Sequence, residues 1–255
     1  CCVRAHDSLS YFDCLSMPHS LSYPFLVRYF SWSFPLRDDI RDYINSFYEP
    51  ICDELMGLRL MSEEEYIPVI RRDTEMFLRT VLESKRPKKI LEIGTAIGYS
   101  AMYFSRICKD AEIYSIEKDE EILEIAKKNV ASFDNSGRIH FMLGDGQEQC
   151  DKLFDMGISD FDFVLIDAAK SHYRRFFDAA VRVCANNAII ISDDIWQRGV
   201  TVSEKYDCKA KHRTNGRRMN EFLSFLTHCP YLHTTLLDIG DGLALSVYKG
   251  NTCKE

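Results

Sequence analysis

The 255-residue chain lacks several features that would place it in a special class of protein. No apolar run approaches the ~20 residues of a membrane-spanning helix, so we expect no membrane association. Its ten cysteines include no C-x-x-C pair, and several lie in helical patterns, where a free thiol acts as a small apolar group. This spacing predicts reduced thiols, no structural zinc and a cytoplasmic location. The net charge is −7, so a nucleic-acid partner would need a local basic patch.

What is present is ordinary for a soluble globular domain: 46% of residues are hydrophobic and 28% are charged. Residues 1–36 differ from the rest, because they are rich in serine and aromatic residues and show no clear period. They lack the uninterrupted apolar core and small-residue cleavage site of a signal peptide. We expect a poorly ordered extension over 1–36 and one domain over 37–255. An arm that faces the substrate or forms a dimer is the alternative.

From residue 37 the hydrophobic periods alternate between helix and strand. Helical patterns cover 37–56 and 62–84, although Pro68 could break the second in its first turns. Further helices are predicted from about 98 and over 119–132, 146–156, 172–184 and 214–228, and strands over 90–93, 112–116, 138–143, 161–166, 188–191, 232–239 and 243–248. The alternation predicts an α/β fold with a mostly parallel seven-stranded sheet. The connection between the last two strands is too short for a crossover, so they should form an antiparallel hairpin.

The stretch LEIGTAIGYS, residues 91–100, reads as a strand, a glycine-bearing turn and a helix start. Gly94 and Gly98 would let the backbone approach a ligand closely, and Glu92 adds a carboxylate. The spacing is neither the dinucleotide-binding G-x-G-x-x-G nor a phosphate-binding loop with its Lys-Ser/Thr. A tight strand-to-helix turn without a ligand is the alternative.

Acidic residues also follow the next two predicted strands. Glu117 comes 23 residues after Gly94, where a carboxylate can accept hydrogen bonds from ribose hydroxyls, and Asp145 follows the third strand. Each could instead cap a helix or lie in its first turn. Three acids at successive strand ends nevertheless favour a cofactor that contains adenosine.

Two buried strands end on carboxylates. The apolar run in FDFVLIDAAK ends at Asp167, with Lys170 three residues later, and the run 188–191 ends in Ser192, Asp193 and Asp194. Carboxylates that stop buried parallel strands usually face a ligand crevice at the sheet's carboxyl edge.

Residues 37–249 resemble the cation-dependent O-methyltransferase family, which includes catechol and caffeoyl-CoA methyltransferases. The resemblance extends in particular to its bacterial tRNA 5-hydroxyuridine methyltransferase branch. The shared motifs are LEIGTAIGYSA, FDFVLIDAAK, the SDD-I-W segment, KHRTNGRRMNEFL and IGDGLALSVYK, whereas residues 1–36 match nothing in the family. The resemblance implies a Rossmann-like class I methyltransferase fold, with helices on both faces of the sheet, and a homodimer.

The resemblance also implies the ligands and the residues that hold them. S-adenosylmethionine would contact Ile70, Glu92, Gly94, Ser100, Glu117, Asp145 and Asp167, with Glu117 on the ribose and Asp145 by the adenine. The metal ligands would be Asp167, Asp193 and Asp194, an oxygen set that suits Mg²⁺ or Mn²⁺ better than zinc. Relatives often carry asparagine where this chain has Asp194. The alternative for Asp193 and Asp194 is that they cap a strand–helix junction.

The implied catalytic residues are Lys170 and Asp167, with Lys170 taking the proton from the hydroxyl that is methylated. A surface Lys–Asp pair is the alternative. A substrate with two neighbouring oxygens would chelate the metal, which acidifies the hydroxyl. Catechol has such a pair, and so does 5-hydroxyuracil, so chelation cannot choose between a small aromatic substrate and tRNA.

A basic segment after the fifth strand bears on the substrate. We interpret four of its residues as a patch for tRNA phosphates near the wobble position of the anticodon loop: Lys211, Arg213, Arg217 and Arg218. An ordinary solvated helix start is the alternative for the segment. The competing activity is methylation of small catechol-like or hydroxylated phenylpropanoid substrates. A cofactor-binding protein without turnover is a third interpretation, which the intact Asp167, Lys170 and Asp193 argue against.

Overall fold

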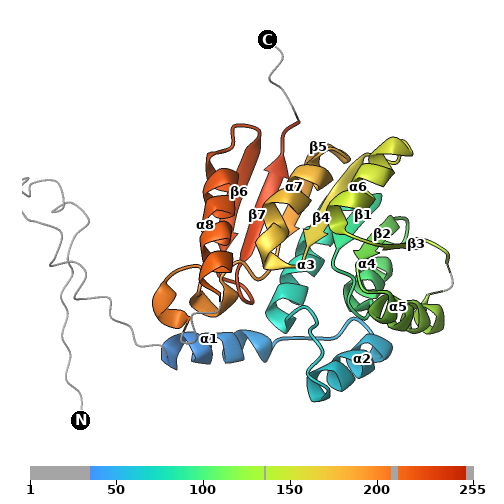
Figure 1. Ribbon diagram of the computed structural model, residues 1–255. Coiled ribbons are helices and arrows are strands. Elements are labelled where there is room, and N and C mark those ends of the chain that lie inside the picture. The colour runs from blue at the N-terminus through green and yellow to red at the C-terminus, as the bar shows by residue number, and fades with distance from the viewer. Residues whose placement is uncertain (1–34, 135, 208–211, 251–255) are drawn as a thin grey trace, which may run out of the picture. The chain divides into compact units, whose positions relative to one another are not determined.

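The computed structural model describes residues 35–134, 136–207 and 212–250 (Figure 1). The chain divides into two units, residues 1–43 and 44–255. Within the first unit the structure describes only the start of helix α1 (Pro35–Asn45), so nearly all of the predicted extension over 1–36 lies outside the described residues. No helix in the described part of the chain is long and apolar enough to cross a membrane.

The second unit is built on a sheet whose described strands number seven, in the order β3-β2-β1-β4-β5-β7-β6. The strands are β1 (Lys89–Ile93), β2 (Glu112–Glu117), β3 (Ile139–Leu143), β4 (Phe161–Ile166), β5 (Cys184–Ser192), β6 (Leu232–Leu237) and β7 (Leu243–Tyr248). Strands β1 to β5 pair in parallel, and β7 runs antiparallel to both β5 and β6. The predicted α/β sheet with its C-terminal antiparallel hairpin is confirmed.

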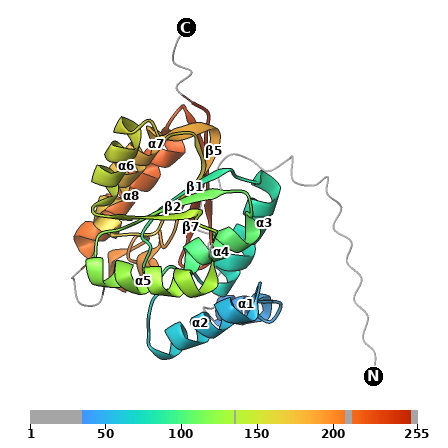
Figure 2. The same cartoon turned by 90° about the vertical axis from the view of Figure 1, so that its right-hand side faces the viewer.

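Helices cover both faces of this sheet (Figure 2). One face packs against α6 (Gly146–Asp155), α7 (Tyr173–Val181) and α8 (Arg213–His228), and the other against α3 (Arg72–Lys85), α4 (Tyr99–Ile107) and α5 (Glu120–Phe133). Successive residues of a strand point to opposite faces, so Val164 joins the first core and Leu165 the second. This double burial explains why β4 is a continuous apolar run rather than an alternating one.

The prediction of two helices over 37–56 and 62–84 was wrong. The structure has three helices there: α1, α2 (Asp53–Glu64) and α3. Pro50 and Pro68 lie in the two connections. Proline has no backbone N–H to donate and disfavours helical geometry in the residue before it, so neither helix can continue through these positions.

Candidate functional site

The candidate site lies at the carboxyl ends of β1 and β4, which are neighbours at the centre of the sheet. The strand order reverses there, and open α/β sheets bind ligands at such a point. The Asp167 N–H donates to the Ile93 carbonyl at 2.9 Å, which brings the two strand ends together. A Cβ on Gly94 would lie 1.9 Å from the Asp167 carbonyl oxygen, and the φ of Gly94 is +110°. Only glycine fits this approach.

The β1–α4 turn lies directly beside Glu117 at the end of β2. The Ala96 N–H donates to one Glu117 carboxylate oxygen at 3.1 Å, and the Lys118 and Asp119 N–H groups donate to the other at 2.9 and 3.1 Å. The turn closes through a 2.9 Å hydrogen bond from the Gly98 N–H to the Thr95 carbonyl. A carboxylate oxygen has lone pairs beyond these contacts, so Glu117 remains able to accept from a ribose.

Glu92 is fully buried and does not face open solvent. The hydroxyls of Ser100 and Ser115 donate to its two carboxylate oxygens, and Thr95 Oγ1 lies 2.6 Å from Ser115 Oγ. Burial raises the pKa of Glu92 to about 7, against the opposing effect of these two hydrogen bonds. In this arrangement Glu92 holds Ser100 and the turn, while Ile70 is also buried, at 5% exposure. Direct cofactor contacts by these residues stay predictions.

The raised pKa of Glu92 predicts a pH-dependent stability. Its ordinary value is 4.5, so the native state binds the proton more tightly and loses stability as the pH rises from about 4.5 to 7. Glu92→Gln keeps the shape without titrating. We expect the wild type to lose up to about 3 kcal/mol of unfolding free energy relative to this variant between pH 4 and pH 8. Urea titrations at the two pH values measure this; parallel pH dependence in both proteins would contradict it.

Asp145 is the N-cap of α6. Its Oδ1 accepts from the Gln147 N–H at 3.0 Å, and its Oδ2 forms a 2.6 Å ion pair with Arg175. The helix-capping alternative therefore describes this residue in the structure, because both carboxylate oxygens have protein partners. A contact with adenine would be additional to the cap and stays a prediction.

Lys170 lies between the carboxylates that follow β4 and β5. Its Nζ is 2.9 Å from Asp167 Oδ1, 3.2 Å from Asp194 Oδ2 and 2.9 Å from the Tyr173 hydroxyl. Burial alone would lower the pKa of Lys170, but the Tyr173 hydroxyl and the two carboxylates outweigh it and raise that pKa. Lys170 is therefore a charged ammonium in this arrangement.

Tyr173 is a site residue that the sequence analysis missed. Its buried hydroxyl accepts from Lys170 and donates to the Asp193 carbonyl at 2.8 Å, so it joins the lysine to the end of β5. The available signal was spacing: Tyr173 follows Lys170 by three residues at a helix start, which places the two side chains on one face.

The carboxylates fit a divalent cation in their donor chemistry. Asp193 is 4% exposed, and burial, together with the charges of Asp167 and Asp194, holds its pKa well above the ordinary value. Three carboxylates against one lysine leave a net negative charge, and oxygen ligands suit Mg²⁺ or Mn²⁺. Within the described residues no three such side chains are already gathered around one point, and Lys170 instead joins Asp167 to Asp194. Asp194 has φ +54°, a conformation that asparagine and aspartate adopt more readily than most residues.

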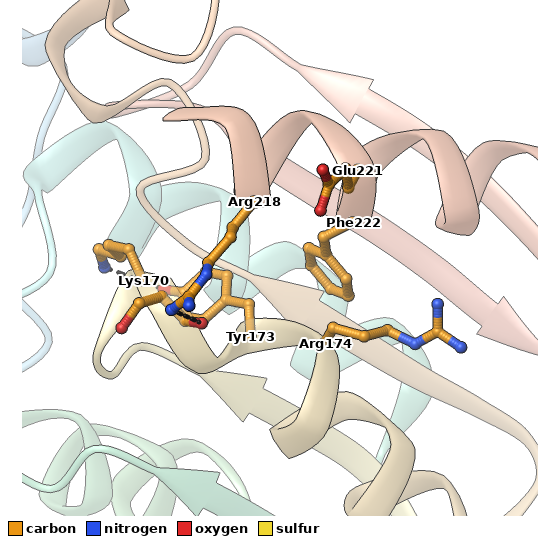
Figure 3. A pocket seen from close by; sticks show the side chains of 7 residues that line it. Lys170, Tyr173, Arg174, Arg218, Glu221 and Phe222 are labelled. Atoms are coloured by element: carbon orange, nitrogen blue, oxygen red, sulfur yellow. Dashed lines mark hydrogen bonds between the residues drawn. The ribbon is translucent and has the colours of Figure 1, made fainter. Parts of the chain in front are cut away.

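The predicted basic patch is only partly assembled beside Lys170, and Lys211 lies outside the described residues. Arg213 Nε lies 3.6 Å from Glu204 Oε2, and Arg217 Nε lies 3.9 Å from Glu221 Oε1. Arg218 instead lines a pocket of about 170 Å³. The pocket's other lining residues are Lys170, Ser171, Tyr173, Arg174, Glu221 and Phe222 (Figure 3). Arg218 Nη1 donates a long, 3.5 Å hydrogen bond to the Ser171 carbonyl.

Comparison with known proteins identifies the class. The O-methyltransferase family profile matches residues 46–249, so the chain belongs to the O-methyltransferase family. It is 26% identical to a catechol O-methyltransferase of Niastella koreensis over 176 residues, which cover 68% of this chain and 79% of that protein. It is 25% identical to a flavonoid 3',5'-methyltransferase of Vitis vinifera over 211 residues, which cover 78% of this chain and 88% of that protein.

Solved structures show the same fold. The SAH-bound methyltransferase of Podospora anserina superposes with a TM-score of 0.75 at 21% identity, over 86% of this chain and 97% of that one. The O-methyltransferase of Bacillus cereus in complex with SAH gives 0.71 at 20% identity, over 83% and 97%. The family and the fold expected from the motifs are thereby confirmed, whereas the resemblance to the tRNA-modifying branch stays a prediction.

Proposed function

We propose that this O-methyltransferase takes its methyl group from S-adenosylmethionine, bound at the carboxyl ends of β1, β2 and β4. The main support is the turn at Gly94, whose backbone packs closely against that of Asp167 and which places Glu117 within hydrogen-bond distance of Ala96. Two solved structures of the same fold carry SAH, the product left after methyl transfer. When bound, the cofactor supplies an electrophilic methyl group on its sulfonium. Glu117 would hold the ribose, and the buried Glu92 would orient Ser100 on the methionine side.

We also propose that the acceptor carries two neighbouring oxygens and is held near a Mg²⁺ or Mn²⁺ ion. Asp167, Asp193 and Asp194 would hold the ion, since they are the carboxylates that follow β4 and β5. Lys170, which lies between Asp167 and Asp194, would contact the acceptor hydroxyl. As an ammonium it stabilises an oxyanion, and after losing its own proton it can accept the hydroxyl proton.

For the acceptor itself we propose 5-hydroxyuridine at the wobble position of tRNA, with 5-methoxyuridine as the product. The supporting observation is Arg218. Among the described residues no carboxylate lies within ion-pair distance of it, and it lines the same pocket as Lys170. Apart from its long hydrogen bond to the Ser171 carbonyl, this guanidinium can bind a phosphate close to the methylated base, because arginine binds phosphate through paired N–H groups.

The test compares Arg218→Ala with Arg217→Ala on tRNA that carries 5-hydroxyuridine. Both substitutions remove one exposed positive charge from α8, but Arg218 lines the pocket with Lys170, whereas Arg217 lies near Glu221 and does not line it. We expect Arg218→Ala to raise the KM for tRNA roughly tenfold with kcat little changed, and Arg217→Ala to raise it less than about twofold. An equal rise in the KM for tRNA in both variants would mean that only the total positive charge of α8 matters, and that Arg218 does not bind a particular phosphate.

A small catechol-like acceptor is the second candidate. It is favoured by the catechol and flavonoid methyltransferases to which the chain is similar, and by the carboxylates near Arg213 and Arg217, which weaken a basic patch. Assays of the wild type on both acceptors separate the two proposals. Efficient methylation of catechols, with no reaction on tRNA that carries 5-hydroxyuridine, would overturn the tRNA proposal.

A further inference from the structure

A buried arginine on α2 ties three helices together. Arg59 is 2% exposed, and its Nη2 donates to the Ile70 carbonyl at 2.9 Å and to the carboxylate of Glu75 on α3. Its Nε donates to the Tyr99 hydroxyl at 3.2 Å, and its guanidinium lies 4.8 Å from the centre of the Tyr99 ring. A charged pair this deeply buried is costly unless its hydrogen bonds are satisfied, and these contacts satisfy them.

Glu75 is the acceptor at the centre of this network. Its Oε2 accepts from the Tyr99 hydroxyl at 2.8 Å as well as from Arg59, and its Oε1 accepts from the Tyr48 hydroxyl at 2.9 Å. The Tyr103 hydroxyl donates to the backbone carbonyl of Glu75 at 2.9 Å. The carboxylate and the guanidinium therefore meet at a single phenol, Tyr99, on α4. Figure 2 shows α3 and α4 on the same side of the sheet.

Tyr99 is the first residue of α4 and directly follows Gly98, the last residue of the cofactor-binding turn. Gly98 has φ +84°, so the chain reverses sharply just before Tyr99. The next residue, Ser100, is held from the other side by Glu92 on β1. Two consecutive side chains thus fix the start of α4 from opposite directions: Tyr99 from the helices α2 and α3, and Ser100 from the sheet.

The same arginine reaches the other wall of the predicted cofactor site. Ile70, whose carbonyl accepts from Arg59, lies in the segment just before α3 and is 5% exposed. Arg59 therefore connects the segment at Ile70 with the turn at Gly98. Its side chain binds the Ile70 carbonyl directly and reaches the turn through the Tyr99 hydroxyl. We propose that Arg59 and Glu75 are positioning residues, which hold the cofactor-binding turn in place through Tyr99. Helix α2, which carries Arg59, therefore contributes to the S-adenosylmethionine site. This inference rests on the proposed use of S-adenosylmethionine.

Tyr99→Phe is the sharpest test, because it removes only the hydroxyl that joins α4 to Arg59 and Glu75. Arg59→Ala would strand the buried Glu75 carboxylate and could unfold the protein. Tyr103→Phe is the matched control: it removes another buried hydroxyl from the same helix and the same glutamate, one turn farther from Gly98. The readouts are the Kd for S-adenosylmethionine by calorimetry, the melting temperature, and kcat with both substrates saturating.

We expect Tyr99→Phe to weaken S-adenosylmethionine binding roughly tenfold, Tyr103→Phe to change it less than about twofold, and both to lower the melting temperature by similar amounts. The kcat of Tyr99→Phe should stay within about twofold of the wild type. Saturating cofactor compensates for weaker binding, so a defect in positioning the turn changes the Kd for the cofactor and not kcat. Unchanged affinity in Tyr99→Phe, or equal losses in both variants, overturns the inference while leaving the proposed function intact. A wild-type protein that fails to bind S-adenosylmethionine overturns both.

Discussion

Lys170→Met should lower kcat by about a thousandfold while leaving the Kd for S-adenosylmethionine within about twofold of the wild type. Lys170 is the cation between Asp167 and Asp194, and Tyr173 holds it in place. Methionine fills similar space but can neither stabilise an oxyanion nor exchange a proton. Single-turnover assays on the proposed acceptor, with calorimetry for the cofactor, measure the two quantities separately.

Lys170→Arg distinguishes the two roles that a lysine can have there. Arginine keeps the positive charge and remains protonated at any working pH, so it cannot serve as a proton acceptor. If the charge alone matters, Lys170→Arg should recover much of the activity that Lys170→Met loses. If proton transfer matters, both variants should be similarly inactive. A Lys170→Met enzyme with near-normal kcat would remove Lys170 from the catalytic machinery altogether.

The parts of the site that could be predicted from the sequence are those set by strand ends. Asp167 and Asp194 are 27 positions apart, yet both carry a contact with Lys170, because neighbouring parallel strands end at the same edge of the sheet. Glu117 lies against the β1–α4 turn for the same reason. In each case the hydrophobic pattern predicts the strand, and the polar residues at or just after its carboxyl end lie at the edge of the sheet.

The parts that could not be predicted depend on contacts between helices or between neighbouring strands. Arg59 and Glu75 read as ordinary charged positions on amphipathic helices, and only the packing of α2 and α3 against α4 buries them as a pair. The contact of Ser115 with Glu92 also lacks a signal, because it depends on the register of β1 and β2 and not on local spacing. Helical periodicity likewise did not show three helices before β1: Pro68 indicated a break in the second pattern, but the break at Pro50 was missed.

Removal of divalent cations should abolish turnover while cofactor binding survives. A chelator-treated enzyme is expected to bind S-adenosylmethionine with little change, to lose activity at least about a hundredfold, and to regain it with Mg²⁺ or Mn²⁺. The physical reason is the charge at the strand ends, where one lysine faces three carboxylates. Full activity in excess EDTA would place the protein outside metal-dependent chemistry.

Asp193→Asn tests whether these particular carboxylates hold the ion. Asparagine keeps the shape and the oxygen that accepts from the Asp194 N–H, and it removes a charge that burial disfavours, so the fold should hold. Asp241→Asn is the matched control, because Asp241 is a half-buried carboxylate whose pKa burial raises and whose Oδ2 accepts from the Arg198 N–H at 2.7 Å. We expect Asp193→Asn to lose the rescue by Mg²⁺ and Asp241→Asn to keep it. Equal loss in both variants would mean that the ion responds to the total charge of the region, and that Asp193 is not its ligand.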